Sequence, residues 1–370
     1  MRPSWVEVDL DAITHNVRLI SNEVGAAALC AVVKADGYGH GDVPVAEAAL
    51  AGGAAQLAVA LVEEGVRLRD AGVEAPILVL SQPPREDAGT MVARRLTPTV
   101  YTAEFATAVA AAAAEPVPIH IKVDTGMHRV GALPEDVPGL VGAVLDDPKL
   151  EFAGMWTHFA VAEDDAEYTK RQLEVFNDVV ERLRAAGIAV PVLHTANTAG
   201  ALLYPEARYN MVRVGLGIYG LRPAPDVAGH LDLRPAMRVV SRVSLAKRLP
   251  AGERPSYGRR RSLPAESTIA TVPVGYADGL SRRLSDAGRV LIGGELRELA
   301  GTVTMDQIVV DMGDDPVEEG DEVVVLGEQG SNSITADDWA DLLGTINYEV
   351  VCRLGPRLPR RYLRAGGDGG

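Results

Sequence analysis

Short apolar runs alternate with longer amphipathic segments from residue 4 to about residue 220. Because the runs are only a few residues long and nearly continuously apolar, they predict strands that are buried on both faces. The predicted strands are residues 6–10, 29–33, 57–61, 77–80, 97–101, 119–123, 152–156, 192–195 and 211–214.

Apolar residues recur near the helical period between these runs and predict the helices 11–24, 62–71, 102–114, 134–146 and 166–186. Alternation of strand and helix is typical of parallel strands joined by crossover helices, in an open sheet or a barrel. Because the number of repeats is roughly eight, the pattern favours an N-terminal (β/α)8 barrel of the TIM type.

The pattern changes after about residue 230 to Val-rich runs separated by Gly, Pro and Asp. Strands are predicted at 238–245, 269–274, 290–292, 308–312 and 323–326, with one helix at 337–343 that Thr335 and Asp338 cap in a capping box. We therefore expect an α/β chain of two domains: a barrel over residues 1–230 and a mainly β domain over residues 231–370.

Composition and charge exclude several classes of protein. The 370 residues are 47% hydrophobic and 24% charged, which suits a globular protein with a large core, and the net charge of −15 disfavours nucleic acid as a partner. Cys30 and Cys352 lie in apolar runs, are expected to be buried thiols, and have no metal-site spacing. Neither a signal-like start nor a run of eighteen apolar residues is present, so we expect a cytoplasmic protein without membrane contact.

The segment 31–41, AVVKADGYGHG, places Lys34 where a strand ends and a glycine-rich loop begins. Catalytic groups of a barrel gather at the carboxyl ends of its strands. A lysine whose stem lies in apolar surroundings loses proton affinity and can form a Schiff base with an aldehyde cofactor. On composition alone, a solvated lysine is the better interpretation.

This segment resembles the cofactor-lysine motif of alanine racemases, and matching motifs extend over nearly the whole chain. The resemblance implies that Lys34 binds pyridoxal 5′-phosphate and that Tyr38 reaches its phosphate. Other barrel enzymes that use this cofactor share part of the motif.

Residues 211–220, MVRVGLGIYG, match the dinucleotide fingerprint G-x-G-x-x-G, but prolines follow where that motif needs a helix. We instead expect the backbone N–H groups of Gly215 and Leu216 to face the cofactor phosphate. Asn197 and Thr198 resemble the family's other phosphate-side pair, with Thr where Ser is common.

Arg213 matches the family's arginine opposite the pyridine nitrogen, a position where other enzymes with this cofactor place a carboxylate. Because a guanidinium keeps its proton, the ring nitrogen stays neutral and the carbanion is less delocalised, which suits simple proton exchange. His158 resembles the histidine between this arginine and the catalytic tyrosine. A rim salt bridge for the arginine and a structural histidine are the alternatives.

Racemisation needs two groups on opposite sides of the α-carbon, one to remove a proton and one to return it. Lys34 can serve one face. Residues 254–261, RPSYGRRR, resemble the family's motif for the second base, here Tyr257. Tyr276, in VGYADG, is the competing candidate and is expected at the substrate entrance.

The segment 122–131, KVDTGMHRVG, resembles the loop whose arginine, here Arg129, holds the cofactor's phenolic oxygen and the substrate carboxylate. Lys122 falls where some members carry a carbamylated lysine, and His128 replaces a frequent glycine. In the late motifs TMDQ and INYEV, resemblance implies that the N–H of Met305 binds the substrate carboxylate. It also places Asp306 at the entrance and Tyr348 near the phosphate.

In this family each site is closed by the β domain of a second subunit, so the resemblance implies a homodimer. We expect an alanine racemase that supplies D-alanine for peptidoglycan, with no metal. A racemase of broader specificity, a decarboxylase or aldolase, and a non-catalytic carrier of the cofactor are the alternatives. Arg213 argues against a decarboxylase, and the β-domain motifs would have no purpose in a carrier.

Overall fold

The computed structural model describes residues 2–364 apart from 225–226, 228 and 286. It divides the chain into two compact units. The barrel unit consists of Ala12–Gly37 and Asp42–Arg234, and the β unit of Met1–Asp11, Tyr38–Gly41 and Pro235–Gly370.

The barrel unit contains an eight-stranded parallel sheet in the order β8-β7-β6-β5-β4-β3-β2-β9. Its strands are β2 (Ala28–Val32), β3 (Gln56–Val59), β4 (Ile77–Val79), β5 (Thr97–Val100), β6 (Val117–Lys122), β7 (Leu150–Trp156), β8 (Val192–His194) and β9 (Met211–Val214). The N–H of Asn210 donates to Leu193 at 3.2 Å, and that of Arg213 donates to Ala196 at 2.9 Å. These bonds join β9 to the chain of β8 and nearly close the barrel, as predicted.

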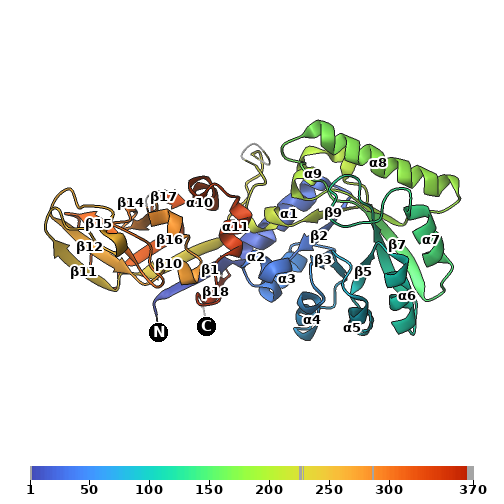
Figure 1. Ribbon diagram of the computed structural model, residues 1–370, viewed down its shortest axis with the longest axis horizontal. Coiled ribbons are helices and arrows are strands. Elements are labelled where there is room, and N and C mark those ends of the chain that lie inside the picture. Colours follow the sequence, from blue (N-terminus) through green and yellow to red (C-terminus); the bar gives the residue numbers. More distant parts are fainter. Residues whose placement is uncertain (1, 225–226, 228, 286, 365–370) are drawn as a thin grey trace. The chain divides into compact units, whose positions relative to one another are not determined.

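Helices follow the strands and cover the outside of the barrel (Figure 1). They are α1 (Leu10–Val24), α3 (Asp42–Ala51), α4 (Val62–Asp70), α5 (Ala88–Ala93), α6 (Ala103–Ala112), α7 (Val137–Leu145), α8 (Ala166–Ala185) and α9 (Thr198–Leu203). The short segment α2 (Lys34–Tyr38) is a left-handed turn after β2. Because both faces of the sheet are covered, each strand buries nearly all its side chains, and all four residues of β9 are buried.

The strand predicted at 6–10 forms, but it is not a barrel strand. It is β1 (Ser4–Asp9), which pairs antiparallel with β10 (Met237–Arg242) and parallel with β18 (Arg360–Leu363) in the β unit. Val6 and Val8 are fully buried, whereas Glu7 between them reaches Arg238 at 2.9 Å. This alternation suits a sheet with one polar face, not a barrel strand covered on both faces.

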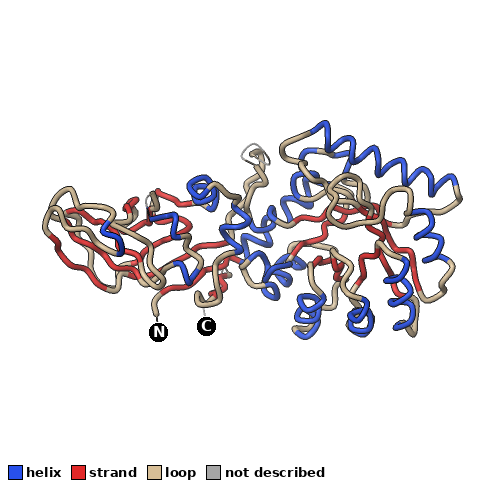
Figure 2. Tube along the Cα trace, viewed as in Figure 1, coloured by secondary structure: helices blue, strands red, loops and turns tan. Residues whose placement is uncertain are grey.

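The strands of the β unit, drawn in red in Figure 2, form two sheets. One is seven-stranded, with β14-β13-β16-β10-β1-β18 in order and β17 beside β16, and the other is β11-β12-β15. The remaining elements are β11 (Leu245–Leu249), β12 (Ser267–Val272), β13 (Arg289–Ile292), β14 (Glu295–Glu298), β15 (Ile308–Gly313), β16 (Glu322–Gln329), β17 (Asn332–Ile334), α10 (Ala336–Leu343) and α11 (Asn347–Cys352).

Two further predictions for this unit were wrong in detail. The single strand 238–245 is divided between β10 and β11, because Val243 N–H donates to Asp321 while Ser244 N–H donates to Thr271, which moves the chain from one sheet to the other. Cys352 is exposed because it ends α11, whereas Cys30 is buried as predicted.

The capping box of α10 is confirmed: Thr335 Oγ1 accepts from the N–H of Asp338 at 3.0 Å, and Asp338 Oδ2 accepts from the N–H of Thr335 at 2.7 Å. None of the helices in the described ranges has the length and apolar character needed to cross a bilayer.

Candidate active site

Lys34 lies two residues after the end of β2 and begins a left-handed turn. Ala35 and Asp36 have φ of 53°, Gly37 has 57° and Tyr38 has 52°. Left-handed backbone costs a non-glycine residue roughly 1–2 kcal/mol. Such a run persists only where its surroundings fix it, and it is typical of functional sites.

Glu64, which the sequence analysis did not single out, fixes the start of this turn. Its carboxylate is buried and accepts from the N–H of Ala35 at 2.7 Å. It also accepts from Ala60 at 2.8 Å and Leu61 at 3.0 Å, at the entry to α4. A glutamate at the third position of a helix that follows a strand was the signal in the sequence.

Tyr38 to Gly41 belong to the β unit, where glycines allow close packing. A Cβ on Gly39 would lie 2.5 Å from the carbonyl oxygen of Val351, and one on Gly41 would lie 2.0 Å from the Tyr362 hydroxyl. Tyr38 is buried, which raises the pKa of its phenol, and its ring centroid lies 6.1 Å from that of Tyr348. The structure thus brings together two of the predicted phosphate-side tyrosines.

Arg213, on β9, is buried and makes no ion pair with a carboxylate in the described chain. Nη1 donates to the carbonyl of His194 at 3.0 Å and lies 2.9 Å from its Nδ1. Nη2 donates to the carbonyls of Thr157 at 2.8 Å and Thr195 at 3.0 Å, and lies 3.2 Å from Nδ1 of His158. No hydrogen bond from Nε to a described residue is present. Burial lowers the pKa of Arg213 to about 9, which still leaves it protonated at neutral pH.

These contacts fix the proton positions on three histidines. Because a guanidinium only donates, the Nδ1 atoms of His194 and His158 must accept from Arg213. His194 then carries its proton on Nε2, which donates to Nδ1 of His120 at 2.8 Å. Burial and the charge of Arg213 lower the pKa of all three imidazoles, that of His120 to about 4, so they are neutral at pH 7.

Trp156 lies at the centre of this polar layer. Its ring centroid is 4.3 Å from Lys122 Nζ and 4.4 Å from Arg213 Cζ, and its ring stacks on His194. Lys122 is buried, and burial, followed by the charges of Arg213, Arg129 and Lys34, lowers its pKa to about 7. Arg213, Arg129 and Lys34 therefore lie near enough to Lys122 for their charges to act on it, and Asp124 opposes them.

Arg129 is exposed on the loop after β6, and it makes no hydrogen bond or ion pair with a described residue. His128 before it has φ of 53°, the region that favours glycine. Asp124 accepts from the N–H groups of His128 and Gly126, both at 3.0 Å, and so holds the loop in this strained form.

Asn197 and Thr198 begin α9. The Asn197 side chain caps the helix by accepting from Gly200 N–H at 2.8 Å, and Thr198 Oγ1 accepts from Gly215 N–H at 3.2 Å. The Gly215 N–H predicted to face an anion thus has a protein acceptor. Leu216 opens a 3-10 turn, where the first N–H groups lack intrahelical acceptors.

In the β unit, Tyr257 lies on a strained loop and its side chain is 74% exposed. Ser256 has φ of 68° and Arg259 has 46°. Thr302 ties the loop down: its Oγ1 donates to the carbonyl of Tyr257 at 2.7 Å, and its carbonyl accepts from Ser256 Oγ at 2.6 Å.

Tyr276 and Met305 lie on adjoining turns. The N–H of Tyr276 donates to the carbonyl of Thr304 at 2.9 Å, and the N–H of Ala277 donates to that of Met305 at 3.0 Å. Tyr276 is 42% and Met305 51% exposed, and Asp306 is also exposed. The structure brings these three predicted substrate-side residues together, whereas Lys34 and Tyr257 belong to different units.

The residues of the barrel unit fit a cofactor with several negative charges and an aldehyde. A lysine at a strand end can form an imine, and the cations near Trp156 need anionic partners. Arg213 Nε has no protein acceptor among the described residues and can donate to a neutral ring nitrogen. Fold and site together define a pyridoxal 5′-phosphate-dependent barrel enzyme with a C-terminal β domain.

The comparisons identify the family. The chain matches the alanine racemase N-terminal domain over residues 8–223 and the alanine racemase C-terminal domain over residues 236–362. It is 45% identical over 367 residues to the alanine racemase of Symbiobacterium thermophilum, with 98% of this chain and 97% of that protein covered. The chain belongs to the alanine racemase family. The family depends on pyridoxal 5′-phosphate, and so does this enzyme.

Solved structures agree. The alanine racemase of Streptomyces lavendulae superposes with a TM-score of 0.93 at 39% identity, covering 100% of this chain and 98% of that one. The alanine racemase of Bacillus anthracis with bound L-Ala-P superposes with a TM-score of 0.93 at 36% identity, covering 99% of this chain and 96% of that one. A histidine racemase from Leuconostoc mesenteroides superposes with a TM-score of 0.90 at 29% identity, covering 98% of each chain. The same fold therefore serves racemases with different amino acids.

Proposed function

We propose that this enzyme interconverts L-alanine and D-alanine with pyridoxal 5′-phosphate bound to Lys34. The observation that carries the proposal is the set of buried cations, Lys122 and Arg213, at the end of a barrel where Lys34 also lies. The relatives of this chain, named alanine racemases over nearly its full length, support the same activity.

The bound cofactor supplies an electron-withdrawing ring that acidifies the α-hydrogen of the amino acid. Arg213 would hold the ring nitrogen through Nε and would keep it unprotonated, because a guanidinium holds its own proton. His158 accepts from Arg213 on Nδ1, so its Nε2 carries a hydrogen that can be donated to a phenolic oxygen. Arg129, free of described ion pairs, is available for the phenolic oxygen of the cofactor and the substrate carboxylate.

Tyr38, Tyr348, Asn197, Thr198, Gly215 and Leu216 form our proposed phosphate-side set. The Thr198 hydroxyl has two roles in this proposal. It holds Gly215 in place by accepting a hydrogen bond from the Gly215 N–H, and it contacts the phosphate itself. Leu216 N–H remains the backbone donor best suited to the anion.

Lys34 and Tyr257 are the proposed two bases. The amine of Lys34 takes or returns the α-proton on one face, and the Tyr257 phenol does so on the other. A phenol has an ordinary pKa near 10. It therefore needs the hydrogen bond from His158 and a nearby guanidinium to act as a base near neutral pH.

We further propose a homodimer in which each site is completed by the partner's Tyr257, Met305, Tyr276 and Asp306. The exposure of Tyr257, Met305 and Tyr276 in the single chain supports this arrangement. Size-separated fractions assayed for racemisation check it: the dimer is expected to be active, and a fully active monomer would contradict the proposal.

A mixing experiment distinguishes shared from self-contained sites. Lys34→Ala and Tyr257→Phe variants, each inactive alone, are unfolded and refolded together. Shared sites predict recovery of about one quarter of wild-type activity, since random pairing makes half of the dimers mixed and each mixed dimer has one intact site. Mixtures that stay inactive contradict sharing.

The activity itself is tested with L-alanine in deuterated water. Formation of D-alanine carrying α-deuterium, approaching an equal mixture of enantiomers, is expected. Release of carbon dioxide would instead favour a decarboxylase. The same assay with serine and other small amino acids defines the substrate range, because a pocket discriminates weakly against one added hydroxyl.

Carbamylation of Lys122 is part of the proposal. Its lowered pKa provides neutral amine near pH 7, which is the form that reacts with carbon dioxide, and the product would place an anion among the cations. Supply of D-alanine to peptidoglycan in the cytoplasm is the physiological role that we propose, and a catabolic role is the alternative.

A further inference from the structure

Tyr276 and Met305 share one rigid support in the β unit. Two backbone hydrogen bonds join their turns. In addition, Gly275 packs so closely that a Cβ on it would lie 2.4 Å from the carbonyl oxygen of Thr304 and 2.5 Å from that of Met305. No side chain fits between the turns, so a shift of one turn moves the other.

A fully buried carboxylate, Asp278, closes the turn of Tyr276. Its Oδ2 accepts from Gly275 N–H at 2.9 Å and from Arg2 Nη1 at 2.8 Å, while Oδ1 accepts from Arg2 Nη2 at 2.6 Å. Arg357 Nε lies 3.4 Å from the same Oδ1. Two guanidinium groups, from opposite ends of the chain, therefore balance one buried negative charge.

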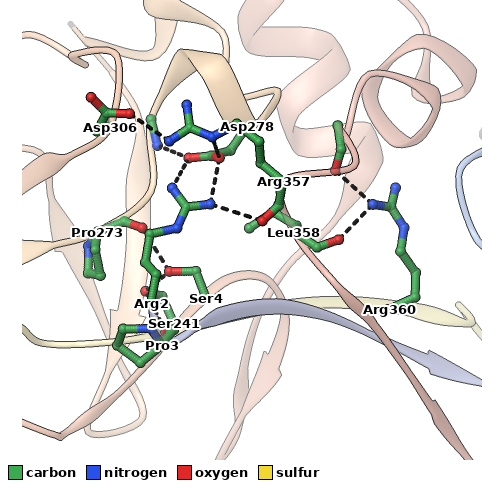
Figure 3. A network of polar contacts seen from close by, with 12 residues as sticks. Arg2, Pro3, Ser4, Ser241, Pro273, Asp278, Asp306, Arg357, Leu358 and Arg360 are labelled. Carbon is green, nitrogen blue, oxygen red and sulfur yellow. Dashed lines mark hydrogen bonds and ion pairs between the residues drawn. The ribbon is translucent and has the colours of Figure 1, made fainter.

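Arg357 also reaches the exposed Asp306. Its Nη2 donates to Asp306 Oδ1 at 2.7 Å, and its carbonyl accepts from Arg2 Nη2 at 3.2 Å (Figure 3). The path Arg2–Asp278–Arg357–Asp306 thus connects the Tyr276 turn to the TMDQ loop. We call these four residues the entrance network.

Asp306 is the only acidic side chain within the TMDQ motif, directly beside the Met305 N–H. Without Arg357 its carboxylate would present an uncompensated negative charge where our proposed function places the substrate carboxylate. With Arg357 bound, this charge is neutralised and the side chain is held toward the Asp278 support.

We propose that Arg357 is a positioning residue that sets substrate affinity by neutralising Asp306 and holding it away from the carboxylate site beside Met305. The inference rests on the proposed function, because it takes Met305 as the carboxylate donor. Arg2 and Asp278 contribute by fixing the position of Arg357.

The test compares Arg357→Gln, Asp306→Asn and the double variant as holoenzymes. Arg357→Gln is expected to raise KM for L-alanine about fivefold with kcat within about twofold, because only the charge near the carboxylate changes. Inhibition by acetate, which offers a carboxylate alone, is expected to weaken by the same factor. Adding Asp306→Asn removes the unbalanced charge and is expected to return both constants to near wild type.

Two controls separate positioning from general stability. Arg238→Gln breaks a comparable pair with Glu7 and Glu322 in the same unit and is expected to leave KM unchanged. Arg357→Lys keeps the charge and is expected to rescue most of the loss.

A double variant no better than Arg357→Gln, or an equal effect from Arg238→Gln, would overturn the inference. A wild-type enzyme that racemises nothing would instead overturn the proposed function, so the two failures are distinguishable.

Discussion

The two units hold their candidate catalytic residues in opposite ways. In the barrel unit, Arg213, Lys122 and His194 are buried, and neighbours within that unit fix their orientation. In the β unit, Tyr257 and Met305 are exposed on turns whose backbone is held by hydrogen bonds. In our proposed function the barrel therefore offers a prepared cofactor site, and the β unit offers groups that act at the site of a second subunit.

The contrast predicts that substitutions of the buried barrel residues change cofactor binding, whereas substitutions of the exposed Tyr257 and Met305 change turnover and substrate affinity. A buried barrel residue whose substitution changed these properties no more than its matched control did would contradict the contrast.

Lys34→Ala gives the largest expected effect. Loss of the amine removes both the covalent anchor and one base, so kcat is expected to fall by about 10⁴-fold or more. Borohydride reduction followed by peptide mapping is expected to label Lys34 in the wild type and nothing in the variant. The exposed Lys149→Ala is the control and should behave as wild type. A yellow, fully active Lys34→Ala enzyme would contradict the entire proposal.

Arg213→Lys comes next. An ammonium cannot replace the planar fork that contacts His194 and Thr157 and that we propose also holds the pyridine nitrogen, so kcat is expected to fall about 100-fold. The absorbance of the bound cofactor should change as well. Arg184→Lys, on the surface of α8 beside Glu181, changes the same group without either effect. Unaltered absorbance in Arg213→Lys would separate this arginine from the cofactor.

Lys122 gives a pH-dependent prediction. In bicarbonate-free buffer its folded-state pKa is about 7, below that of an unfolded lysine near 10.4, so the unfolded state binds more protons between these values. The free energy of unfolding should therefore rise with pH in this window, by an order of 2–4 kcal/mol in total.

Lys122→Met should remove this rise, and the exposed Lys149→Met should keep it. Both measurements use denaturant unfolding at several pH values. Labelled bicarbonate followed by carbon-13 NMR checks for the carbamate near pH 7, where a signal lost in Lys122→Met is expected. A rise that survives in Lys122→Met would assign the titration to another group.

Thr198 gives the smallest effect. Thr198→Ala loses the acceptor for Gly215 N–H and should weaken cofactor binding about tenfold, while Thr198→Ser keeps the hydroxyl and should stay within about twofold. Cofactor affinity by fluorescence titration checks this. Equal effects of the two substitutions would indicate a role for the methyl group.

Local pattern predicted most of the barrel because each strand and helix lies next to its sequence neighbours. It misplaced Ser4–Asp9, whose partners Met237–Arg242 and Arg360–Leu363 are distant in sequence, although the alternation of Val6, Glu7 and Val8 was visible.

Resemblance supplied residues such as Arg213, but it did not reveal what orients them. His120 and Lys122 are two residues apart in β6, so their side chains point to the same face of the strand. This spacing indicates a polar layer inside the barrel. Glu64 lies far from Lys34 in sequence, and only the fold brings its carboxylate to Ala35.

The position of β1 has a consequence for synthesis on the ribosome. This strand leaves the ribosome before the other described strands, yet it lies between β10 and β18, the last strand of the described chain. Until β10 emerges, Trp5, Val6 and Val8 have no strand to pair with, and the other edge of β1 stays unpaired until β18 emerges. Nascent chains that stop before β18 should therefore expose an unpaired apolar edge and be prone to aggregate.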